Sequence, residues 1–261
     1  MDVKKIQEKL EKLQNPTKKT QYADRSVTFF KPQLGKNLVR FVPNKNNPED
    51  PFVELFFHYG IGPKVMLSPI SYGEKDPIVE FANGLKKSKD PEDWKLAKKL
   101  QPKQRTFALV ISRNEEDKGA RWYEFGKSVY QELLALGSDE EVGDFTDVIE
   151  GRDIKVDVTE GNPYQETAIR PTMKSSPLSK DNTLVKKWLD EQPDLMENYK
   201  KYSYDEIKDF LTKWLNPEEV VEVNAVVTEP NKAFETSNTP KPKTKPIEVI
   251  TSSEFDDIFG E

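Results

Sequence analysis

The stretch Arg105-Thr-Phe-Ala-Leu-Val-Ile-Ser112, followed by Arg121-Trp-Tyr-Glu-Phe125, decides the type of fold. Both segments are rich in aromatic, aliphatic and β-branched residues and are bounded by Pro, Gly or Asn, which is typical of β-strands. Segments of the same character at residues 26–31, 37–42, 52–58, 153–159 and 167–171 are predicted to be strands as well. The sequence therefore predicts a sheet built from distant parts of the chain.

Helices are predicted between and after these strands. Apolar residues recur at intervals of three and four in the segments 2–14, 78–87, 93–100 and 127–136, which is the period of an amphipathic helix. A further helix is expected to begin at Ser203, because Ser203 and Glu206 have the spacing of a capping box. Strands and helices together predict an α+β fold.

Composition excludes several classes of protein. Among the 261 residues there is no Cys and a single His, His58. Disulfides, thiolate zinc sites, Fe–S clusters and Cys nucleophiles are therefore absent, and a site with several His ligands cannot form. No apolar run approaches the ~18 residues of a membrane span, and the segment 1–5 does not resemble a secretory signal. We expect a cytoplasmic, non-enzymatic protein without a cofactor, a metal or a membrane contact.

The net charge of −6 is unevenly distributed along the chain. Residues 1–127 carry a net charge of +8, residues 128–227 carry −11, and residues 228–261 carry −3. The segments 31–45 and 85–106 are especially basic and have aromatic residues in or near them. Cations that neutralise phosphates and rings that stack on bases are the means of binding single-stranded nucleic acid. In the alternative interpretation, the rings belong to the β-core and the lysines form a solvated rim.

The C-terminal part differs in character from the rest. Residues 228–250 are rich in Pro, Thr and Lys and are predicted to be a flexible, disordered linker. Residues 251–261 form an acidic tail that also carries apolar side chains, and its expected contact residues are Phe255, Asp256, Asp257, Ile258 and Phe259. Such a tail is suited to docking into a basic, partly apolar groove. It could instead fold back on the basic surface of its own chain, or act only as a solubilising tail.

Three motifs together resemble one known family. They are Asn37-Leu-Val-Arg-Phe-Val-Pro-Asn-Lys45, which continues to Phe57-His58-Tyr59-Gly60, then Lys103-Gln-Arg-Thr-Phe-Ala108, and Tyr123-Glu-Phe-Gly-Lys127. Their order and spacing resemble those of the replicative single-stranded DNA-binding (helix-destabilising) protein of T-even-type phages. The resemblance is good over residues 30–160 and weaker up to 227.

The resemblance implies an OB-fold β-barrel core over residues 21–227, with a helical insertion at about 60–102 and a DNA cleft beside the barrel. In the family, one His and three Cys of the insertion bind zinc. His58 matches that His, but the Cys positions fall at Met66, Asp76 and Val79, so this chain resembles a zinc-free member. The insertion is then expected to be held by packing of Ile70, Ile78, Phe81, Leu85 and Trp94.

The resemblance places Arg40, Lys103, Phe107, Tyr123 and Lys127 in or near the cleft. A further cleft Arg of the family corresponds to Glu124, for which Arg121 is expected to compensate. Together with the basic and aromatic segments, the predicted DNA-binding residues are Lys36, Arg40, Lys103, Arg105, Phe107, Arg121, Trp122, Tyr123 and Lys127. Trp122 and Tyr123 point to opposite faces of a strand, so only one of the two rings is expected to face the ligand.

The family also has an N-terminal basic segment that contacts the neighbouring protomer. Residues 1–20 are expected to form this arm, with Lys4 and Lys5 as contact residues. The resulting hypothesis is a sequence-independent single-stranded DNA-binding protein of phage replication, recombination and repair, located in the cytoplasm of the infected host cell. It would self-associate along DNA and recruit a polymerase, a helicase loader and a recombinase through its tail. A single-stranded RNA-binding protein and a protein-interaction scaffold are the alternatives.

Overall fold

The computed structural model describes residues 25–216, which fall into two units. Unit one contains the described residues up to Val53 together with Thr106–Leu195, and unit two contains Glu54–Arg105 and the described residues from Met196 onward. The predicted helix at 2–14, the arm with Lys4 and Lys5, the linker 228–250 and the tail 251–261 lie outside the described residues. Within residues 25–216, no helix is long and apolar enough to cross a membrane.

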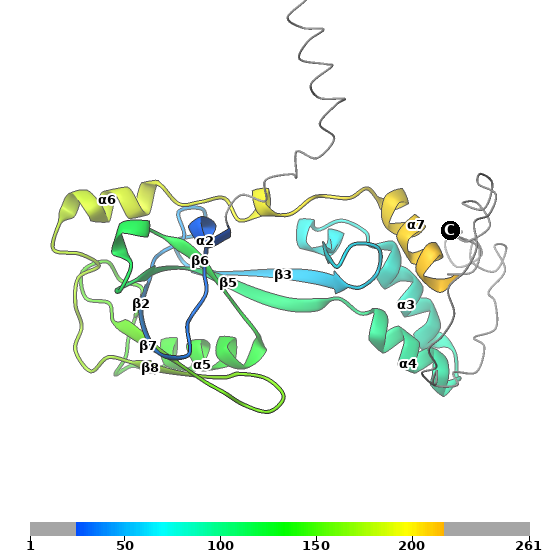
Figure 1. Ribbon diagram of the computed structural model, residues 1–261, viewed down its shortest axis with the longest axis horizontal. Coiled ribbons are helices and arrows are strands. Elements are labelled where there is room, and N and C mark those ends of the chain that lie inside the picture. Colours follow the sequence, from blue (N-terminus) through cyan, green and yellow to red (C-terminus); the bar gives the residue numbers. More distant parts are fainter. Residues whose placement is uncertain (1–24, 217–261) are drawn as a thin grey trace, which may run out of the picture. The chain divides into compact units, whose positions relative to one another are not determined.

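Unit one is built on a sheet whose strands come from three separate regions of the sequence, 29–41, 103–125 and 153–171 (Figure 1). Neighbouring strands are antiparallel, except for the parallel pair β1 and β6. The strand order is β1 (Phe29–Phe30), β6 (Arg121–Phe125), β5 (Lys103–Ser112), β2 (Gly35–Phe41), β7 (Asp153–Thr159) and β8 (Glu166–Pro171). The first residues of β5 belong to unit two.

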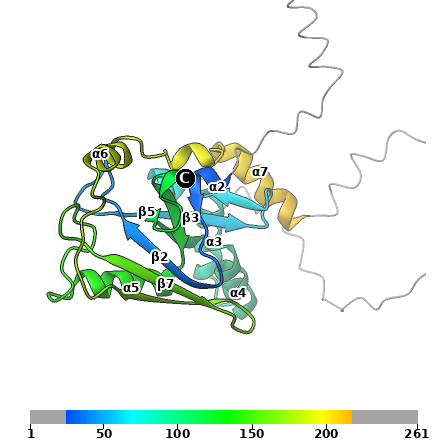
Figure 2. The ribbon, with the colours of Figure 1, turned by 60° about the vertical axis from the view of Figure 1, so that its left-hand side comes forward.

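One face of this sheet is covered by α5 (Lys127–Gly137), which lies against β8 (Figure 2). Val129 and Leu133 of α5 are buried in the same core as alternate residues of the strands, such as Val39 and Phe41 of β2. The short helices α2 (Arg25–Thr28) and η2 (Glu116–Lys118) and the helix α6 (Asn182–Asp190) complete unit one. Residues therefore face the core every second position on the strands and every third or fourth on α5.

Unit two combines a strand pair with helices. β3 (Phe52–Tyr59), which begins in unit one, pairs antiparallel with β4 (Val65–Leu67). The remaining elements are η1 (Pro69–Tyr72), α3 (Pro77–Lys87), α4 (Pro91–Leu100), η3 (Met196–Asn198) and α7 (Tyr204–Leu215). α3 lies beside both α4 and α7 (Figure 1), and the apolar stripes of these three helices share one buried core.

Local sequence signals set the helix boundaries of unit two. Asp76 and Asp90 accept hydrogen bonds from backbone N–H groups at the starts of α3 and α4, and a Pro follows each of them; both features favour a helix start. Ser203 and Glu206 form the predicted capping box. Gly62 has φ +67°, and a Cβ added there would lie 2.5 Å from the Phe210 ring of α7, so this close approach requires Gly.

The predicted mixture of strands and helices is confirmed, and most predicted elements lie within one or two residues of their observed bounds. The segment 26–31 was predicted to be a strand throughout, which is wrong, because α2 occupies its first part and only Phe29–Phe30 are extended. The predicted packing is confirmed for Ile78, Phe81 and Leu85. It is wrong for Ile70 and Trp94, which are 36% and 53% exposed.

Candidate nucleic-acid interface

Arg40, the predicted phosphate contact on β2, lies inside unit one. Its side chain is 0% exposed, and its Nη2 donates to the backbone carbonyls of Asp147 and Ser176, each at 2.7 Å. Its Nη1 lies 3.4 Å from a carboxylate oxygen of Asp153. Because the guanidinium is enclosed and both of its Nη atoms contact groups of the protein, Arg40 is not accessible to DNA in this structure. Arg40 joins two loops to the sheet.

The predicted aromatic contacts of unit one are also buried. Phe107, Trp122 and Tyr123 are 0%, 4% and 3% exposed. Trp122 donates its Nε1–H to the Pro193 carbonyl at 2.9 Å, whereas Tyr123 packs in the core against Phe30. Neither the Trp122 ring nor the Tyr123 ring is exposed in this structure, because both faces of β6 are covered.

Arg121 is buried with these rings. Its Nη2 donates to Glu115 at 2.6 Å, and its guanidinium lies 5.5 Å from the centroid of the Phe30 ring. Its side chain is only 3% exposed. The expectation that Arg121 compensates for Glu124 as a DNA contact is not supported by this position, because the charge is already balanced by a carboxylate within the protein.

The other predicted residues reach the surface. In unit one, Lys36 of β2 and Lys127, the first residue of α5, are exposed. In unit two, Lys103 is exposed and Arg105 is partly exposed, and both belong to the first part of β5. Lys103 and Arg105 are two residues apart on a strand, so their side chains leave the same face. Of the predicted contact residues, these four cations are accessible to solvent, so a phosphate can reach them.

Unit two pairs such a cation with an exposed ring. The Nζ of Lys103 lies 5.8 Å from the centroid of the Tyr59 ring, within the ~6 Å range of a cation–π contact. Tyr59 is 43% exposed and ends β3 next to the buried His58. Tyr59 belongs to one of the motifs that carry the family resemblance, but it is not among the predicted contact residues.

The same arrangement recurs on α4. The Nζ of Lys98 lies 5.4 Å from the centroid of the Trp94 ring, and the Nζ of Lys99 lies 5.0 Å from that of Trp214 on α7. Trp94 is 53% exposed, and Trp214 is partly exposed. The i,i+4 spacing of Trp94 and Lys98 on a helix is a signal from which this pair could have been predicted.

We use the name basic–aromatic cluster for the three lysine–ring pairs of unit two and the neighbouring Arg105, that is, for Lys98, Lys99, Lys103, Arg105, Tyr59, Trp94 and Trp214. Four positive charges occur within eight consecutive residues, 98–105. All three lysines of this set lie over rings. Chemically, the cluster offers cations for phosphates and flat apolar faces for bases.

A comparison with protein families gives a result that agrees with this chemistry. The family model described as "gp32 DNA binding protein like" matches residues 33–217, which is more than half of the chain. The chain belongs to the gp32-like DNA-binding family. The match contains both the basic–aromatic cluster and the sheet of unit one from β2 onward. None of the curated proteins matches the chain.

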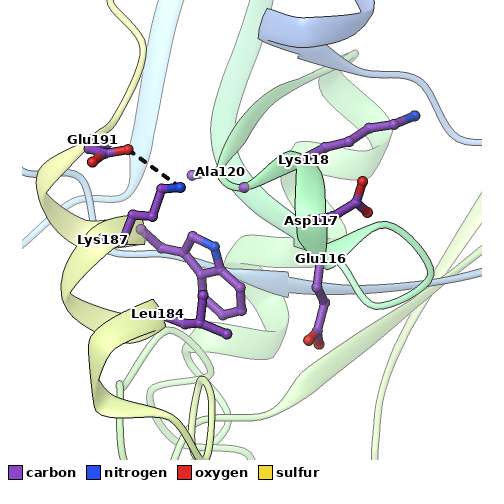
Figure 3. A pocket seen from close by; sticks show the side chains of 9 residues that line it. Glu116, Asp117, Lys118, Ala120, Leu184, Lys187 and Glu191 are labelled. Atoms are coloured by element: carbon purple, nitrogen blue, oxygen red, sulfur yellow. Dashed lines mark ion pairs between the residues drawn. The ribbon is translucent and has the colours of Figure 1, made fainter.

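The gp32-like chain also has a pocket in unit one, between η2 and α6 (Figure 3). Charged side chains of both signs surround it, among them Glu116, Asp117 and Lys118 on one side and Lys187 and Glu191 on the other. Lys187 and Glu191 form an ion pair at 4.0 Å. The pocket contains none of the predicted DNA-binding residues, and its mixed charge does not indicate a phosphate site.

Proposed function

We propose that this gp32-like protein binds single-stranded DNA without reading its sequence, and that the basic–aromatic cluster of unit two is a principal contact. The observation that carries the proposal is the set of lysines placed over solvent-accessible rings: Lys103 over Tyr59 and Lys98 over Trp94. We also include Lys36, Lys127 and Arg105 among the phosphate contacts, since solvent reaches them. The protein acts as a binding protein and not as an enzyme.

The mechanism follows from the two kinds of group. Lysines that neutralise phosphates release counterions from the strand, which makes the affinity depend steeply on salt. Rings stack on bases for about 1–3 kcal/mol per base, irrespective of base identity. In the free protein Lys98, Lys99 and Lys103 each contact a ring, so an approaching strand can place its base on the ring and its phosphate on the displaced ammonium group. One lysine–ring pair therefore suits one nucleotide.

We further propose that residues 21–227 form an OB-fold core and that 60–102 is an insertion in it. The mostly antiparallel sheet of unit one, with β5 between β6 and β2, is compatible with a partly open barrel. The helices α3 and α4 lie within the proposed insertion. OB-folds bind single strands on their strand face and loops.

Tryptophan fluorescence tests the proposed contact. Among the four tryptophans, Trp94 is exposed, whereas Trp122 and Trp188 are buried. Titration with oligo(dT) at low salt should quench the emission, and Trp94→Phe should remove a large part of this quenching while Trp188→Phe retains it. Binding without any contribution of Trp94 to the quenching would show that the strand lies elsewhere. Competition with matched oligo(U) and duplex DNA distinguishes the RNA alternative.

We propose that the tail 251–261 recruits replication and recombination proteins, such as a polymerase, a helicase loader and a recombinase, in an infected host cell. Four acidic residues surround its apolar side chains. Deleting 251–261 should leave the melting temperature unchanged and strengthen DNA binding, because an anionic competitor of the phosphates is removed. Replacing Phe255 and Phe259 with Ser keeps the charge, so it should weaken partner capture without changing DNA affinity. Weaker DNA binding after the deletion would contradict the competition.

We propose that residues 1–20 mediate self-association along DNA through Lys4 and Lys5. The variant Lys4→Gln/Lys5→Gln should bind a short oligo(dT) that holds one protein molecule as the parent does. On long poly(dT) it should bind less cooperatively. Equal cooperativity of the two proteins would assign the protomer contact to another part of the chain. If no polynucleotide is bound at low salt while partner proteins are captured, the scaffold alternative is favoured.

A further inference from the structure

Four positions of unit two that the family resemblance equates with zinc ligands lie close together. His58 and Met66 are paired across β3 and β4. The Nε2 of His58 is 2.9 Å from Oδ2 of Asp76, and the backbone N–H of Val79 donates to Oδ1 of Asp76 at 3.3 Å. The chain therefore keeps the convergence of these positions while changing three of the four side chains.

The groups at these positions do not fit zinc. Structural zinc sites are almost always tetrahedral, with four Cys or His ligands. Here the set consists of one imidazole, one carboxylate, a thioether and an aliphatic side chain. Among residues 25–216, no group of three or more His, Cys, Asp or Glu is placed to hold a metal ion. A zinc ion is thus not expected to contribute to the stability of unit two.

A buried polar network lies where the four positions equated with zinc ligands come together. The side chains of His58 and Asp76 are 1% and 0% exposed. Oδ2 of Asp76 contacts His58 and accepts a hydrogen bond from the hydroxyl of Ser68, which is also buried. Oδ1 accepts from the N–H groups of Ile78 and Val79. The carboxylate therefore makes four polar contacts, enough to satisfy a charge in an apolar interior.

We propose that the His58–Asp76–Ser68 network replaces a structural metal ion and makes unit two independent of metal. His58 is on β3, Ser68 follows β4, and Asp76 caps α3. One carboxylate thus joins three backbone segments, as an ion with ligands from the same segments would. The network also fixes the end of β3, where Tyr59 follows His58. The inference concerns folding and holds independently of DNA binding.

Metal analysis of the full-length protein provides the first test. The purified protein should contain zinc far below one atom per chain, and its melting temperature should be the same with EDTA and with added zinc. One tightly bound zinc per chain, whose removal by EDTA lowers the melting temperature, would overturn the inference, because binding of a structural metal contributes directly to folding.

A double-mutant cycle provides the second test. Asp76→Asn keeps the helix cap, and His58→Phe keeps a ring without its N–H. His58→Phe removes the imidazole from a buried carboxylate and leaves it only its three other contacts, so the melting temperature should fall by about 6–20 °C. The melting temperature of the double variant should fall by much less than the sum of the decreases in the two single variants, because the double variant no longer has a buried carboxylate without the imidazole. Additive losses would show that the two groups do not act together.

The exposed ion pair of Lys187 and Glu191, with side chains 60% and 69% exposed, is the matched control. Its cycle of Lys187→Gln and Glu191→Gln should show almost no coupling. If His58→Phe does not fold, Ser68→Ala removes one donor to Asp76 together with the acceptor that caps η1. In a cycle with Asp76→Asn the loss of the cap cancels, so the coupling gives the same information. Additivity in that cycle would also overturn the inference.

Discussion

The substitution Arg40→Lys tests whether Arg40 stabilises the fold or binds DNA. The substitution keeps the positive charge that a phosphate would need. It loses the planar fork with which one Nη2 donates to the carbonyls of Asp147 and Ser176 at 2.7 Å. Hydrogen bonds to charged groups contribute about 1.5–3 kcal/mol each, and a lysine in the same space can recover only part of them. We expect a loss of about 2–4 kcal/mol in the free energy of unfolding.

In a domain of this size, such a loss lowers the melting temperature by about 4–16 °C. Thermal unfolding followed by circular dichroism measures the shift, and Lys36→Arg, an exchange at an exposed position of the same strand, is the matched control and should not change it. Oligo(dT) affinity, measured well below the transition, should stay within about twofold of the parent. An unchanged melting temperature together with weaker DNA binding would show that Arg40 binds DNA and does not stabilise the fold.

Three further outcomes are expected. Tyr59→Leu should weaken oligo(dT) binding by about 5- to 150-fold, the equivalent of one stacked base, without changing the dependence on salt; an unchanged affinity would exclude Tyr59 from the interface. Lys103→Gln should reduce the slope of log affinity against log salt by about 0.7 with the melting temperature unchanged, whereas the control Lys187→Gln should leave the slope as it is. Burial alone would raise the pKa of Asp76, but hydrogen bonds from His58 and other neighbours outweigh it and hold the pKa below its usual value. Asp76 therefore stabilises the fold above about pH 4 and loses this effect as the pH falls through its folded pKa, so the difference in melting temperature between the parent and Asp76→Asn should narrow in acid. A difference that stays constant down to pH 3 would contradict this assignment.

Much of the secondary structure follows from local sequence. β6 and β7 have the predicted bounds, because their β-branched and aromatic runs end at clear breakers such as Gly126. The capping box at Ser203 fixes the start of α7 in the same way. β4, only three residues long, has no periodicity of its own to detect and was missed. α6 was missed as well, although Asp181 and the spacing of Leu184 and Trp188 carried a signal for it.

The site was harder to predict than the fold, because exposure depends on how segments cover one another. Alternation along β6 says that Trp122 and Tyr123 point to opposite faces, but not that both faces are covered. Arg40 looks like a surface cation in the sequence, and only the tertiary structure brings Asp147, Asp153 and Ser176 to it. The exposed pair of Lys103 and Tyr59 depends on the contact between β5 and β3, whereas the pair of Lys98 and Trp94 lies within α4. Only the pair within α4 could have been predicted from the spacing of residues in the sequence.

The dependence of DNA affinity on salt shows whether the lysines of the basic–aromatic cluster neutralise DNA phosphates. Oligo(dT) is titrated into the full-length protein at several salt concentrations, and the logarithm of the affinity is plotted against that of the salt concentration. We expect a straight line of negative slope, with about 0.7 of slope for each phosphate neutralised, and a shallower line for the combined variant Lys98→Gln/Lys103→Gln. Affinity that does not change with salt, or a slope that is the same in the combined variant, would show that these lysines do not bind the phosphates.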